Sequence, residues 1–191
     1  MFRTIVNYGT KIESCAFWHD AFTEEQLDYL QGIAKNNTLP GLVGGANNNG
    51  EVRRSEVSWL NDDSNHSWVF DRIAHVVSTL NAEYFQFNLG HFSEPVQLSN
   101  YSEHNNGTYH WHQDFGSIGP YRKLSLVLQL SDPREYEGGE LQLLTEKKET
   151  TIAKQRGLIT VFPSWTLHRV TPTTRGNRQS MVVWVSGEPF R

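Results

Sequence analysis

The sequence has 191 residues, with 17 lysines and arginines against 21 aspartates and glutamates, which gives a net charge of −4. This balance argues against a protein that binds nucleic acid through a strongly basic surface. Hydrophobic residues make up 37% and aromatic residues 12%, so the composition excludes a disordered chain and predicts a single domain over residues 1–191. The single cysteine, Cys15, excludes an intrachain disulfide.

We expect a soluble protein of the cytoplasm. The first residues carry charges and lack the apolar stretch of a signal peptide. No apolar run is long enough to cross a membrane, so no membrane partner is expected. One cysteine is also consistent with a reducing compartment. The oligomeric state stays open, because exposed strand edges cannot be located from periodicity alone.

Residues 1–84 are expected to form helices and a loop that support a β-rich core over residues 85–191. The spacing of Thr23 and Gln26 is that of a capping box, and apolar residues at helical intervals follow. This pattern predicts a helix that ends near Asn36.

Three further elements are predicted before the β-rich core. Residues 36–50 are rich in asparagine and glycine, so we interpret them as a long loop that acts as a substrate lid. A short strand is predicted over residues 52–60. A second helix is predicted over residues 67–84, where apolar residues recur on one face.

Short β-rich segments alternate with turn signals through the rest of the chain, with no long helix between them. This pattern is typical of a double-sheet sandwich or barrel. Turn signals at residues 137–139 and 175–177 predict hairpins and therefore antiparallel pairing. The segments comprise residues 83–89, 94–101, 108–114, 123–130, 139–144, 150–154, 157–162, 167–171 and 180–185.

His112 and Asp114 stand two residues apart in the predicted strand over residues 108–114, so both should lie on one face, together with His110. An imidazole nitrogen and a carboxylate oxygen on one face can bind the same metal ion. His168, at the end of another predicted strand, would complete a triad of two histidines and one carboxylate. Such a triad leaves coordination positions open, which suits non-haem Fe(II) chemistry. His110 is an alternative ligand without the two-residue spacing to the aspartate.

Arg178 stands ten residues after His168, at the start of the last predicted strand. A guanidinium there could form a bidentate pair with a carboxylate, and Ser180 could donate a hydrogen bond from the same face. A metal triad with an inward-facing arginine is a site for a dicarboxylic acid that chelates the cation. The alternative is a purely structural role, in which His112 is a hydrogen-bonded strand residue and Asp114 a turn residue.

In this order, the motifs resemble those of the Fe(II)- and 2-oxoglutarate-dependent oxygenases, in particular the prolyl 4-hydroxylase-like branch with its small bacterial and phage members. The resemblance covers residues 97–185. It implies a mainly β fold, with N-terminal helices beside a double-stranded β-helix, the jelly-roll core also seen in cupins. The matching motifs are Tyr109-His110-Trp111-His112-Gln113-Asp114, residues 122–131, residues 136–141, residues 157–172 and Arg175-Gly176-Asn177-Arg178.

The resemblance implies that His112, Asp114 and His168 bind Fe(II). It also implies that Arg178 and Tyr101 bind the cosubstrate 2-oxoglutarate, beside the hydrogen bond expected from Ser180. O2 is then the oxidant, and ascorbate stays open as an accessory reductant. Related halogenases lack the carboxylate that Asp114 provides, so a hydroxylase is favoured.

The reaction implied by the resemblance is hydroxylation of a C–H bond in a peptidyl residue, proline first, with release of succinate and CO2. A free amino acid or another small molecule is an alternative substrate. A nucleic-acid demethylase is a further alternative, which the net charge of −4 disfavours. From a different class, the chain could be a non-catalytic jelly-roll binding module with a residual metal site, which needs no inward-facing Arg178. A zinc hydrolase is disfavoured, because no glutamate stands at His-Glu-x-x-His spacing.

Overall fold

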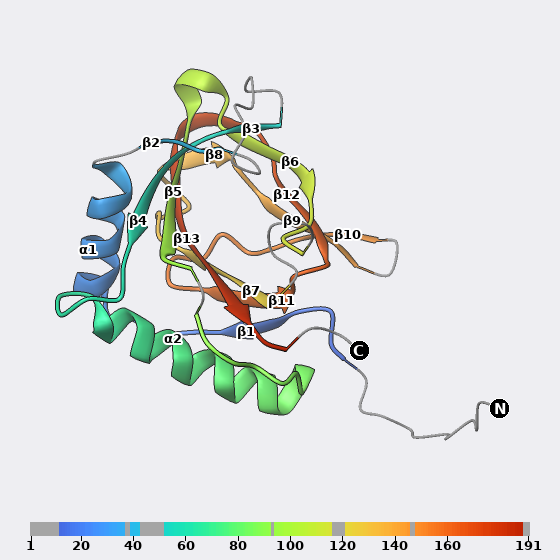
Figure 1. The fold of residues 1–191 in the computed structure, drawn as a ribbon. Coiled ribbons are helices and arrows are strands. Elements are labelled where there is room, and N and C mark those ends of the chain that lie inside the picture. The colour runs from blue at the N-terminus through green and yellow to red at the C-terminus, as the bar shows by residue number, and fades with distance from the viewer. Residues whose placement is uncertain are drawn as a thin grey trace.

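Two antiparallel sheets and two α-helices make up the described part of the chain (Figure 1). The computed structural model describes residues 12–36, 39–42, 52–92, 94–115, 121–145 and 148–188. The larger sheet contains β1 (Ala16–Trp18), β2 (Leu39–Pro40), β4 (Glu56–Leu60), β5 (Val96–Ser102), β7 (Arg122–Gln129), β8 (Tyr136–Gly138), β11 (Ile159–Pro163) and β13 (Thr173–Ser186). The smaller sheet contains β3 (Arg53–Arg54), β6 (Thr108–His112), β9 (Leu141–Thr145), β10 (Lys148–Thr151) and β12 (Leu167–Val170).

The chain passes repeatedly from one sheet to the other. The strand order is β1-β11-β7-β13-β5-β4-β2 in the larger sheet, where β8 pairs with β13 beside this path, and β10-β9-β12-β6-β3 in the smaller sheet. From β5 to β7, and again from β11 to β13, each strand lies in the sheet opposite to the strand before it. This alternation produces the jelly roll, and the predicted fold class is therefore confirmed.

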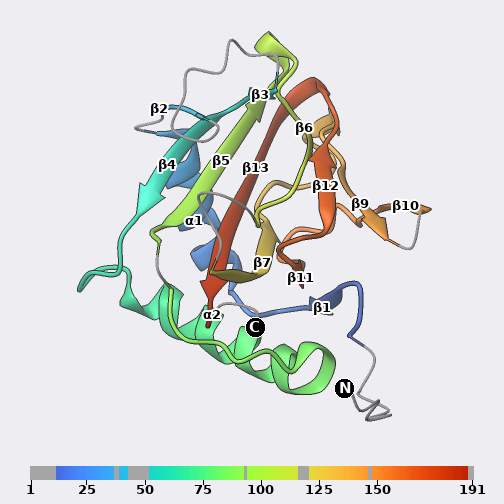
Figure 2. The same cartoon turned by 45° about the vertical axis from the view of Figure 1, so that its right-hand side comes forward.

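Both α-helices pack against the outer face of the larger sheet, away from the smaller sheet (Figures 1 and 2). Helix α1 (Glu24–Lys35) begins at the predicted capping box, because the Thr23 hydroxyl accepts from the Gln26 backbone N–H and the Gln26 side chain accepts from that of Thr23. Helix α2 (Ser67–Leu80) places an apolar face on the sheet. Most helical stability comes from such packing rather than from intrinsic propensity.

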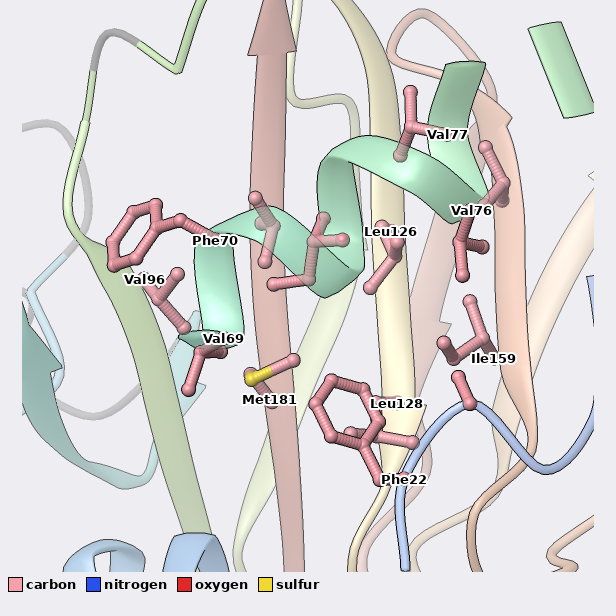
Figure 3. Packing of buried hydrophobic residues seen from close by; sticks show 14 of the residues in the cluster. Phe22, Val69, Phe70, Val76, Val77, Val96, Leu126, Leu128, Ile159 and Met181 are labelled. Atoms are coloured by element: carbon pink, nitrogen blue, oxygen red, sulfur yellow. The ribbon is translucent and has the colours of Figure 1, made fainter. Parts of the chain in front are cut away.

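The main core lies between these helices and the larger sheet (Figure 3). Val69 and Val76 of α2 pack over Leu126 and Leu128 of β7 and Met181 of β13, all buried. Burying each aliphatic side chain of this size contributes roughly 1.5–3 kcal/mol. A smaller cluster of buried residues comprises Val127, Leu141, Leu143, Ile152, Leu158 and Phe162.

The predicted strand over residues 83–89 is wrong. Helix α2 ends at Leu80, and the chain continues as a π-helical turn, Asn81–Phe85. Gln86 then ends the helix with a φ of 56°. The aromatic residues of this segment gave it a strand-like composition, but helix formation extended through it. Only Leu89 forms an isolated β-bridge.

The predicted antiparallel pairing is confirmed, but neither turn signal forms a hairpin. Residues 175–177 lie inside β13, which spans 14 residues, and residues 136–138 form β8, which pairs with β13 rather than with the next strand. A Cβ at Gly176 would lie 2.0 Å from the Glu135 carbonyl oxygen, and φ is 69° there. The glycine therefore allows close approach between strands instead of reversing the chain.

The predicted loop over residues 36–50 lies largely outside the described residues, so its role as a lid stays a prediction. Its described part includes β2, which pairs with β4. None of the helices in the described part of the chain is long and apolar enough to cross a membrane. The cytoplasmic location and the single domain also stay predictions.

Candidate active site

Three candidate metal ligands meet where β6 and β12 lie side by side (Figure 2). His112 ends β6, His168 is its paired residue in β12, and Asp114 follows two residues after His112. One ligand atom from each residue lies within 4.8 Å of the other two. Asp114 Oδ1 lies 3.8 Å from His112 Nε2, and Asp114 Oδ2 lies 3.5 Å from His168 Nε2. The structure thus brings the three predicted residues together.

A β-bulge in β6 determines which histidine faces this cluster. His168 pairs with His112 and Val170 pairs with Tyr109, so β6 has one residue more than β12 over this interval. Tyr109 and His112 therefore share a face, and their rings stack with centroids 3.4 Å apart. The prediction that His110 lies on the ligand face is wrong, because it assumed unbroken alternation, and this residue is exposed.

Backbone carbonyl groups hold both imidazole rings in one orientation. His112 Nδ1 lies 2.7 Å from the His110 carbonyl oxygen, and His168 Nδ1 lies 2.9 Å from that of Thr166. A carbonyl oxygen only accepts, so each Nδ1 carries a hydrogen and each Nε2 is the nitrogen that lies toward Asp114. Histidines that bind metals commonly donate their other ring N–H in this way.

Asp114 is held from two directions. Ser125 Oγ donates to its Oδ2 at 2.7 Å, and its own backbone N–H donates to the Ser164 carbonyl oxygen at 2.9 Å. Burial alone would raise the pKa of this carboxyl group, but the charges of His168 and His112 and the serine hydrogen bond outweigh burial and lower it. The aspartate is therefore a carboxylate at neutral pH.

The protonation states around the cluster suit metal binding. Burial, helped by the charge of His168, lowers the pKa of His112 from 6.5 to about 3, so its ring is neutral at pH 7. Burial raises the pKa of Tyr109 to about 12, so the phenol stays neutral. Two imidazoles and one carboxylate bind divalent transition metals and leave coordination positions open. The residues present therefore fit Fe(II).

Arg178 forms a second polar centre between the sheets and is only 1% exposed. Its guanidinium donates to Gln129 at 2.9 Å and to Ser180 at 3.3 Å, and its Cζ lies 5.4 Å from the centroid of the Tyr101 ring. Within the described residues, its Nε and the buried hydroxyl of Tyr136 have no hydrogen-bond partner, and no carboxylate pairs with the guanidinium. A buried cation of this kind is costly unless an anion binds it. The guanidinium of Arg178 therefore suits a ligand carboxylate.

Sequence reasoning placed Arg178, Ser180 and Tyr101 together but missed Gln129 and Tyr136. Gln129 alternates with the leucines of β7, and that alternation could have identified it as an inward polar residue. Tyr136 reaches Arg178 only because β8 pairs with β13, and that pairing has no local sequence signal.

A cavity of about 350 Å³ is lined by residues next to the candidate ligands in the chain, among them Gln113 and Leu167, but by none of the three ligands. Its lining consists of Ile12, Glu13, Ser14, Gln113, Leu144, Thr145, Pro163, Trp165, Thr166 and Leu167.

The sequence is similar to that of known oxygenases. Residues 96–186 match the family model described as the 2OG-Fe(II) oxygenase superfamily. A PKHD-type hydroxylase of Teredinibacter turnerae is 38% identical over 87 residues, which are 42% of this chain and 38% of that protein. A PKHD-type hydroxylase of Nitrosomonas europaea is 28% identical over 174 residues, which are 87% of this chain and 75% of that protein. The alignment thus covers well under half of the Teredinibacter protein.

The fold is similar to those of solved prolyl hydroxylases. A Pseudomonas putida prolyl-4-hydroxylase superposes with a TM-score of 0.73 at 17% identity, over 92% of this chain and 93% of that one. A Trichoplax adhaerens prolyl hydroxylase, solved with a peptide fragment, superposes with a TM-score of 0.76 at 13% identity, over 91% and 84%. These identities show a shared fold, and with the family match they confirm the resemblance found in the sequence.

Proposed function

We propose that this chain, whose residues 96–186 carry a 2OG-Fe(II) oxygenase domain, is a dioxygenase that depends on Fe(II) and 2-oxoglutarate. The observation that carries the proposal is the cluster of His112, Asp114 and His168, in a fold that also buries Arg178 without a carboxylate partner in the described residues. The proposed reaction is hydroxylation of a C–H bond in a peptidyl residue, proline first. The prolyl hydroxylase folds support this substrate class, since one of those structures holds a peptide.

In this proposal each polar group has a defined task. His112, Asp114 and His168 hold Fe(II), and Arg178 pairs with the distal carboxylate of 2-oxoglutarate beside Tyr101 and Ser180. When bound, the iron and its cosubstrate supply the O2-dependent oxidation of the C–H bond, with conversion of 2-oxoglutarate into succinate and CO2.

The protein positions these groups before any ligand binds. The two carbonyl groups fix the imidazole tautomers, and Ser125 fixes one carboxylate oxygen of Asp114. Gln129 and Ser180 hold the guanidinium of Arg178. Preorganised ligands lose little freedom on binding, and a dry interior strengthens each charge interaction.

The test does not require the substrate. Fe(II) and then 2-oxoglutarate are added to the protein without oxygen, and the visible metal-to-ligand charge-transfer band is recorded. We expect the band in the wild type and its loss or strong weakening in Asp114→Ala and Arg178→Ala. Arg175→Ala is the matched control, because this exposed arginine lies on the same strand and pairs with Glu137.

A wild-type protein that binds iron but gives no band would contradict the proposal and favour the non-catalytic binding module. A band that survives in Arg178→Ala would remove this arginine from the cosubstrate pocket. Once the band is established, turnover of 2-oxoglutarate with peptides, free amino acids and methylated nucleic acid separates the substrate classes. The same assay, run with and without ascorbate, tests the accessory reductant.

A further inference from the structure

A second buried guanidinium lies close to the candidate metal site. Arg53 of β3 is 6% exposed and pairs with Tyr109 of β6. Its Cζ lies 4.8 Å from the centroid of the Tyr109 ring, which in turn stacks on His112. A single aromatic ring therefore separates Arg53 from a candidate iron ligand. Arg178, by contrast, projects from the larger sheet.

The protein leaves the outer end of this guanidinium weakly satisfied. Arg53 Nε donates to Ser55 Oγ at 2.7 Å, and a Cβ at Gly41 would lie only 2.8 Å from that nitrogen, so the backbone covers this edge. Within the part of the chain that the structure describes, the terminal nitrogens contact only Gln97 Oε1 and Ser99 Oγ, both at the long distance of 3.4 Å. The fork of terminal N–H groups is thus the part left for a ligand.

The neighbouring side chains add a donor to this fork. The Ser99 side chain is fully buried, and its oxygen accepts from Gln97 Nε2 at 2.8 Å as well as from Arg53. Among the described contacts, the hydroxyl hydrogen of Ser99 has no acceptor. Two guanidinium nitrogens and a hydroxyl therefore present hydrogens with no anion to receive them, and a carboxylate is their natural complement.

Arg122 is a third arginine near the site, and its contacts are those of a structural residue. Arg122, beside the candidate ligands, forms a bidentate ion pair with Glu94 and lies 4.0 Å from the Trp184 ring centroid. In the described part of the chain, Arg53 has only neutral hydrogen-bond partners. A buried guanidinium without an anion costs stability, so a fold retains one most readily where a ligand completes it.

We propose that Arg53, with Gln97 and Ser99, binds a carboxylate of the substrate that is oxidised. This inference rests on the proposed function and narrows its substrate class, because Arg178 and the iron already account for the two carboxylates of 2-oxoglutarate. The substrate is therefore anionic beside the reacting carbon. The carboxylate belongs to a free amino acid, to the C-terminus of a peptide or to an acidic residue next to the oxidised one.

The test compares acids with their neutral amides. N-acetyl-L-proline and N-acetyl-L-prolinamide are titrated separately into the protein loaded with Fe(II) and 2-oxoglutarate without oxygen. Calorimetry and the shift of the charge-transfer band report binding. We expect the acid to bind about tenfold or more tightly than the amide, because a charge-assisted pair is lost in the amide. L-proline, and a blocked peptide with aspartate next to proline, then distinguish the three sources of the carboxylate.

The variants assign this preference to the proposed residues. Arg53→Gln should bind acid and amide equally, whereas Arg53→Lys should keep part of the preference. Ser99→Ala retains the arginine and should lose several-fold of the preference, so the inference stays testable if Arg53→Gln folds poorly. Arg54→Gln is the matched control, because the neighbouring arginine donates to the Asn106 carbonyl oxygen instead, and it should behave as wild type.

Two results would overturn the inference. One is equal binding of acids and amides by the wild type while the charge-transfer band is present. The proposed function would then stand, but Arg53, Gln97 and Ser99 would not bind a substrate carboxylate. The other is an unchanged preference in Arg53→Gln together with weakened 2-oxoglutarate binding, which would assign Arg53 to the cosubstrate pocket. Absence of the band in the wild type would instead be a failure of the proposed function.

Discussion

The same strands form both faces of the larger sheet, but the two faces differ in whether their side chains find partners within the protein. On β7, Leu126 and Leu128 point outward into the core under α2, while Ser125 and Gln129 point inward to Asp114 and Arg178. On the outer face, the helices cover the apolar side chains of the strands (Figure 3). The inner face carries the guanidinium of Arg178, and Arg53 of the smaller sheet reaches it through Gln97 and Ser99; neither guanidinium pairs with a carboxylate in the described residues. Stability therefore belongs mainly to the outer face, and ligand binding to the inner face.

The largest expected effect is a loss of stability from the outer face. Leu128→Ala removes a fully buried side chain of the main core and should lower the free energy of unfolding by about 2–5 kcal/mol, because a cavity remains. Urea denaturation of the metal-free protein measures this change. The affinity of the folded protein for Fe(II) should stay within a factor of about two. A large loss of iron affinity would show that the two faces are coupled.

Ser125→Ala should have a smaller effect, and it should weaken metal binding rather than the stability of the fold. It removes the hydrogen bond to Asp114 and should weaken Fe(II) binding by about 10–100-fold, with little change in thermal stability. Fe(II) titration against a competing chelator gives the affinity. Ser58→Ala is the control, since this buried serine donates to the backbone of the α1 region and should leave iron affinity unchanged. Equal losses in both variants would refute a specific role for Ser125.

Arg178→Met should have the smallest effect on folding. Replacing a buried charge by an apolar side chain of similar length is often neutral or stabilising when no counter-ion is lost. The melting temperature of the metal-free protein should therefore stay the same or rise, although 2-oxoglutarate binding is lost. Differential scanning calorimetry measures it. A fall in stability of more than about 2 kcal/mol would mean that the guanidinium is a structural element, and the contrast between the faces would not hold.

Local spacing made one helix and part of the site predictable from the sequence. The two-residue interval between His112 and Asp114 and the capping box at Thr23 depend on neighbours in the chain, so the sequence alone contains their signals. His168 required one assumption, that its strand pairs with the strand of His112, and the structure has this pairing.

Other parts of the site depend on contacts that no local pattern encodes. Arg53 approaches Tyr109 only because the short strand β3 pairs with β6, and Tyr136 reaches Arg178 only through β8. The exposure of His110 follows from a bulge, which breaks the alternation on which the prediction depended. Strand order and irregularities are set by tertiary packing, so a sequence can indicate an inward polar residue without indicating what it meets.

The bulge in β6 also determines how the site responds to the loss of one residue. The strand has one residue more between Tyr109 and His112 than its partner β12 requires. In a regular strand, an inserted or deleted residue turns every following side chain to the opposite face. Without the extra residue, the interval between Tyr109 and His112 would be two residues in a regular strand. Residues two apart lie on the same face, so both side chains would still share it. A variant that lacks one of the two residues between them should therefore keep the stacked pair of rings.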